Sequence, residues 1–96
     1  MNKAGQSIRI LCDALCSINF EGKNYQGIIE NVSLTGALIK MDAATPAALC
    51  PGVTCNLMIY SEMPGSCTEY KCLVVRIDSK LIGLKFLEII MAGSVA

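Results

Sequence analysis

The sequence predicts an all-β domain, built as an antiparallel barrel or sandwich of about six short strands. Runs of aromatic, β-branched and alternating apolar residues are separated by turn signals every eight to twelve residues or so. No stretch shows a long helical period. Hydrophobic residues make up 53% of the 96-residue chain, and the mean hydropathy is +0.52. This length and composition indicate one domain with a large core.

The first two predicted strands form a hairpin. In residues 14–20 the even positions are apolar while Ser17 and Asn19 are polar, which is typical of a half-buried strand. Residues 21–24 are short, polar and turn-forming. The strand over residues 25–30 is therefore expected to pair antiparallel with the first strand.

The later elements follow the same logic. A strand over residues 36–41 is followed by a connection at 42–52 that contains two prolines and a glycine. Further strands are predicted at 53–61, 68–77 and 81–87, and residues 88–91 predict a short C-terminal helical turn. The expected layout is a flexible arm at residues 1–8, a β-domain at 9–90 and a frayed tail at 91–96.

A polar motif lies between the strands at 25–30 and 36–41. Asn31 and Ser33 are two positions apart, so in an extended chain they project to the same face. Their short side chains can bond nearby backbone groups and hold a bend. Gly36 permits a positive φ or a close approach of a ligand. The motif is therefore either a stiff corner or half of a binding site.

The pattern Asn31-x-Ser33-x-x-Gly36 between apolar strands resembles the [D/N]-x-S-x-x-G signature of PilZ domains, the bacterial receptors for cyclic di-GMP. Residues 74–78 followed by 81–86 are similar to the last two strands of that family, and the similarity spans residues 9–88. The resemblance implies a six-stranded antiparallel split β-barrel. It also implies cyclic di-GMP as the ligand, with no further cofactor.

A second PilZ motif, R-x-x-x-R, precedes the first strand and is only half present. Arg9 stands in the second position, but Gly5 occupies the first. The resemblance implies a ligand site of Arg9, Asn31, Ser33 and Gly36. Lys3 would be an accessory point charge that cannot form a bidentate fork. Losing one bidentate arginine contact costs about 1–3 kcal/mol, roughly 5- to 150-fold in affinity. The alternatives are a solvated Arg9 and a turn-stabilising Asn31–Ser33 pair.

Charge and residue types exclude several other functions. Eight basic and eight acidic residues cancel, so no global field favours a nucleic-acid polymer or an anionic membrane. The chain has no histidine, and its carboxylates are scattered without a phosphate-binding glycine loop. We therefore expect no enzymatic activity. The N-terminal residues lack the apolar run of a signal peptide, so a cytoplasmic protein without membrane insertion is expected.

The six cysteines show spacings of three or four residues within each close pair, and none forms the C-x2-C of common zinc sites. The alternatives are a disulfide scaffold and a metal site. Because no export signal is present and cysteine packs as a small hydrophobe, free thiols in or near the core are favoured, with no metal.

Two functions follow from the motifs. In the first, the protein is a cyclic di-GMP receptor that orders its N-terminal arm and so presents a new surface to an unidentified protein partner. In the second, it is a PilZ-like adaptor that has lost nucleotide binding and acts through protein contacts alone. Gly5 favours the adaptor, whereas the intact Asn31-x-Ser33-x-x-Gly36 motif favours the receptor.

Overall fold

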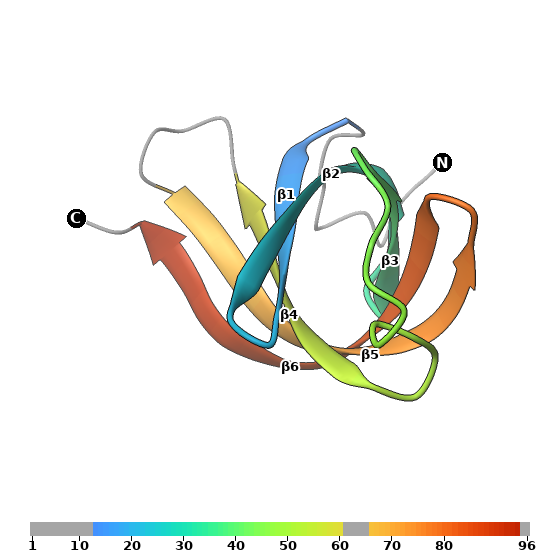
Figure 1. The fold of residues 1–96 in the computed structure, drawn as a ribbon. Helices are drawn as coiled ribbons and strands as arrows, with labels where there is room; N and C mark the ends of the chain where they lie inside the picture. Colours follow the sequence, from blue (N-terminus) through green and yellow to red (C-terminus); the bar gives the residue numbers. More distant parts are fainter. Residues whose placement is uncertain (1–12, 61–65, 95–96) are drawn as a thin grey trace, which may run out of the picture.

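The protein is a closed antiparallel β-barrel of six strands (Figure 1). The computed structural model describes residues 13–60 and 66–94, and in this part of the chain no helix occurs. The strands follow the barrel order β1-β2-β3-β6-β5-β4, so the barrel prediction is confirmed. Their bounds are β1 Leu15–Phe20, β2 Lys23–Val32, β3 Gly36–Met41, β4 Thr54–Tyr60, β5 Ser66–Asp78 and β6 Leu81–Ser94.

Two tight turns join neighbouring strands where the sequence predicted them. Glu21 and Gly22 connect β1 to β2 with φ values of 53° and 81°, and Phe20 pairs directly with Lys23. Positive φ at both central residues is the feature of a type I′ turn, whose twist matches that of the flanking strands. Ser79, with φ of 61°, begins the corresponding turn between β5 and β6.

The interior is filled by alternate side chains from all six strands. Each fully buried large aliphatic side chain contributes about 1.5–3 kcal/mol relative to leaving it exposed. The connection between β3 and β4 adds Leu49, which is 1% exposed and donates its N–H to the carbonyl of Pro46 at 3.0 Å. Leu49 therefore anchors this connection to the barrel. The most deeply buried aliphatic residues of the strands are Ile18, Ile29, Ile39, Leu57, Val74 and Ile82.

The predicted helical turn at residues 88–91 is wrong, because these residues continue strand β6. Glu88 pairs with Lys71 and Ile89 with Tyr70, so β5 supplies partners for this segment. The register shifts at Leu87 and Ile90, which makes both residues bulges and breaks the alternation that would have indicated a strand. In Figure 1, β5 in orange and β6 in red curve side by side along their length. β6 also runs through residues 91–94, which the sequence assigned to a frayed tail.

Five cysteines lie in the described residues, and all are free thiols. Cys16, Cys55, Cys67 and Cys72 are buried, and Cys50 is exposed. The sixth, Cys12, lies outside the described residues. Burial raises the pKa of Cys55 to about 11. Burial, with a smaller contribution from the Cys55 thiol opposite on β4, raises the pKa of Cys72 to about 12. These thiols stay protonated near neutral pH and behave as small apolar side chains.

Candidate functional site

A bulge at Glu30 determines where Asn31 points. Ile29 is buried and pairs with Ile39, but the next pair along is Asn31 with Leu38, so Glu30 is an extra residue on β2. Strict alternation from Ile29 would have turned Asn31 into the core. The bulge shifts the phase, and Asn31 is exposed on the outer face of the barrel wall.

This bulge was not predicted, although the sequence contains a signal for it. Val32, three residues after Ile29, packs against the core, and an even-numbered step would be needed for both to face inward in a regular strand. An apolar pair with odd spacing, on either side of two polar residues, indicates an extra residue in the strand. The bulge precedes Asn31 and so does not change the relation between Asn31 and Ser33, which are both exposed.

Ser33 stabilises the turn that joins β2 to β3. Its N–H donates to the carbonyl oxygen of Gly36 at 2.8 Å, and its Oγ accepts the N–H of Thr35 at 3.2 Å. The carbonyl of Thr35 in turn accepts the N–H of Phe86 at 2.8 Å, which ties the turn to β6. The turn-stabilising alternative therefore applies to Ser33. Leu34, at the tip, is 68% exposed.

Gly36 is required by the contact between β3 and β6. Its backbone does not adopt a positive φ, so conformational freedom is not the reason for the glycine. A Cβ at this position would collide with the carbonyl oxygen of Leu84 and lie 3.4 Å from the Cα of Lys85. The backbone of β6 fills the space beside Gly36 in which the sequence predicted the close approach of a ligand. A contact between Gly36 and a ligand stays a prediction.

The structure thus brings Asn31, Ser33 and Gly36 together at one end of the β2–β3 hairpin, with Asn31 and Ser33 exposed. Arg9 and the accessory Lys3 lie outside the described residues, as does Gly5. An asparagine side chain presents two N–H donors and a carbonyl acceptor, which suits the edge of a nucleobase. The exposed amide of Asn31 is therefore the part of this hairpin end best placed to bind a base.

The family model of the PilZ domain matches residues 5–93. The chain belongs to the PilZ domain family. This match confirms the family resemblance, and the six-stranded barrel agrees with it. PilZ domains form a family of cyclic di-GMP receptors and adaptors, which are binding domains and not enzymes. A search of curated proteins found no match to the chain.

Within residues 13–60 and 66–94, no helix is long and apolar enough to cross a membrane. The same residues contain no group of three or more cysteine and carboxylate side chains that could hold a metal ion.

Proposed function

We propose that this PilZ domain is a cyclic di-GMP receptor. Its ligand would lie on the outer face at the end of the β2–β3 hairpin, where Asn31 and Ser33 are exposed. The bulge at Glu30 is the observation that carries the proposal, because it directs the Asn31 amide toward solvent at a point where the alternating pattern would have buried it. Arg9 would contact a guanine or a phosphate from the N-terminal side, with Lys3 as an accessory charge.

Signalling would follow from ordering of the segment ahead of β1. Ligand that contacts both the hairpin end and Arg9 binds one arrangement of residues 1–9 more tightly than the others, and so shifts the population toward it. The new surface would be recognised by a protein partner, in the cytoplasm. This mechanism requires that the differential affinity exceeds the cost of ordering, about 1–2 kcal/mol for each backbone residue fixed.

A second candidate function is an adaptor that has lost nucleotide binding. Gly5 replaces the first arginine of the PilZ motif, and the Ser33 hydroxyl is already used in its own turn. The end of β6 also exposes apolar side chains that suit a protein contact: Leu87 is 46% exposed, Ile89 63% and Ile90 46%.

Calorimetric titration of the full chain with cyclic di-GMP, at fixed ionic strength, tests both functions. We expect wild type to bind, Arg9→Ala to bind more weakly and Gly5→Arg to bind about 5- to 150-fold more tightly, because a second bidentate fork is restored. Ala4→Arg is the matched control, since it adds the same charge outside the motif spacing. Binding by Gly5→Arg alone would support the adaptor. If none of these proteins binds at millimolar ligand, the receptor proposal is wrong.

A further inference from the structure

Strand pairing places four residues in one line across the outer face of the barrel. Asn31 of β2 pairs with Leu38 of β3, Leu38 pairs with Gly83 of β6, and Gly83 pairs with Arg76 of β5. Directly paired residues project to the same face of a sheet, and the strand neighbours of Leu38 and Gly83 are buried in the core. We call these four residues the outer row. Three inter-strand spacings make it about 14 Å long.

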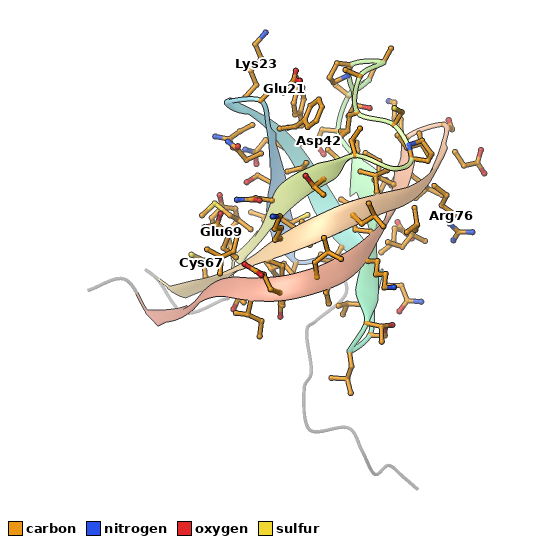
Figure 2. The ribbon with its side chains drawn as sticks, turned by 90° about the horizontal axis from the view of Figure 1, so that it is seen from below. Glu21, Lys23, Asp42, Cys67, Glu69 and Arg76 are labelled. Atoms are coloured by element: carbon orange, nitrogen blue, oxygen red, sulfur yellow. The ribbon has the colours of Figure 1, made fainter. Side chains whose placement is uncertain are left out.

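The side chain of Arg76 lies along this row. A Cβ built on Gly83 would be 2.9 Å from Cγ of Arg76 and 3.2 Å from its Nε. The arginine stem therefore passes over Gly83, and β6 has no side chain there to block it. Arg76 is exposed, and Figure 2 shows its side chain outside the barrel wall. Gly83 is buried, so the stem shields a position that would otherwise face solvent.

Two lysines lie on either side of the outer row. Lys40 is two residues from Leu38 on β3, and Lys85 is two residues from Gly83 on β6, so both share the outer face. Both are exposed. Glu30 and Asp78 are the acidic residues nearest along β2 and β5. Asp42, two residues after Lys40, is a third exposed carboxylate, so these carboxylates equal the three cations and any attraction for an anion is local to the cationic side chains.

Among the described residues, the row combines the groups that a cyclic dinucleotide would need. Asn31 offers donors and an acceptor for a base edge. Leu38 is half-buried and offers an apolar surface to a planar purine, and the stem of Arg76 covers Gly83 beside it. The guanidinium of Arg76 can pair with a phosphate, form a fork with guanine O6 and N7, or stack on a base.

We infer that Arg76 is a ligand-binding residue of the PilZ site in this chain. From β5 it supplies the guanidinium that is missing at Gly5, and the ligand lies over Leu38, between Asn31 and the Arg76 stem that covers Gly83. The inference rests on the proposed function, because it assigns one more contact to the same ligand. It differs from the motif-based site in placing the second arginine on the barrel wall and not on the N-terminal segment.

Titration of the full chain with cyclic di-GMP at fixed ionic strength tests the assignment. Arg76→Ala is expected to weaken binding by about 5- to 150-fold, the range for one bidentate contact. Arg76→Lys keeps the charge but not the fork, and should recover only part of this loss. Lys23→Ala is the control, since it removes the same charge from the β1–β2 hairpin, which Figure 2 shows well away from Arg76. It should bind within about 2-fold of wild type, which is the effect expected of remote exposed charges. Urea unfolding confirms that each variant is folded.

The outcomes separate the inference from the proposed function. If wild type binds and Asn31→Ala binds weakly, but Arg76→Ala matches Lys23→Ala, the assignment of Arg76 is wrong while the receptor stands. If Arg76→Lys matches wild type, a point charge suffices and the guanidinium assignment is wrong. If wild type itself does not bind at millimolar ligand, the proposed function is overturned, and the role of Arg76 with it.

Discussion

Gly36 of β3 and Gly83 of β6 lie on neighbouring strands of the barrel, but different kinds of atoms fill the space where a side chain would be. At Gly36 an added Cβ would meet the carbonyl oxygen of Leu84, which belongs to the β6 backbone. At Gly83 it would meet the side chain of Arg76. A paired strand cannot move without breaking its ladder, whereas a long side chain can rotate away. Gly36 therefore lets β3 and β6 pair closely, and Gly83 leaves room for the side chain of Arg76, the proposed ligand-binding residue.

The glycine of the PilZ motif has a structural role in this chain. A glycine in a binding motif suggests that a ligand approaches closely. Gly36 has instead a complete structural explanation, in a contact that lies within the barrel wall. The glycine that leaves room for a side chain of the outer face is Gly83, outside the motif, and that side chain is Arg76.

The largest effect is expected from Gly36→Ala. Because the new methyl group collides with backbone, β3 and β6 must separate, and the free energy of unfolding should fall by about 3 kcal/mol or more. Urea unfolding followed by circular dichroism measures this loss. Gly22→Ala is the matched control: no atom lies within 4 Å of its added Cβ, but its φ is +81°. That change should cost only about 1 kcal/mol, from backbone strain alone. Equal losses for the two variants would contradict the crowding at Gly36.

A pH-dependent loss of stability, of intermediate size, is expected from two buried cysteines, Cys16 of β1 and Cys72 of β5. Burial raises the pKa of Cys72 to about 12 from an ordinary value of 9.0, and burial followed by the charge of Asp42 does the same for Cys16. The unfolded thiols ionise above pH 9 while the folded ones stay protonated, so stability is complete below pH 9 and falls as pH rises toward 12. At pH 10 each of these thiols should lower the free energy of unfolding by about 1 kcal/mol.

Urea midpoints at pH 8 and pH 10 test this dependence. Cys72→Ala should show a smaller fall between the two pH values than wild type, because one titrating thiol is gone. Arg76→Ala should show the same fall as wild type, since it alters only the outer face. If the urea midpoint of Cys72→Ala falls as much as that of wild type between the two pH values, burial of this thiol does not contribute to the pH dependence of stability.

The smallest change in stability is expected for Gly83→Ala, within about 1 kcal/mol, because the Arg76 stem can rotate away. Its effect should appear in cyclic di-GMP affinity, as a loss of about 5-fold or more when the guanidinium is displaced from the outer row. The decisive control is the double variant with Arg76→Ala, in which Gly83→Ala should cause no further loss of affinity. Additive losses would show that Gly83 acts independently of Arg76.

Much of the fold could be predicted from the sequence because it depends on short-range patterns. The alternating residues at 14–20, the polar turn at 21–24 and the apolar run at 36–41 each indicate local structure, and all were found close to the predicted bounds. The motif around Asn31 identified the family, which the match over residues 5–93 confirms.

Only the tertiary structure decided the direction of Asn31, the role of Gly36, the strand at residues 88–91 and the outer row that ends at Arg76. Each depends on which residue of another strand lies opposite, and bulges at Glu30, Val75, Leu87 and Ile90 change that pairing by single positions. A one-residue shift turns a side chain from the core to the solvent. Asn31 and Arg76 are 45 positions apart in sequence and are aligned only by the registers of three strand pairs. Local alternation shows that a strand exists, but its register results from the packing of the whole barrel.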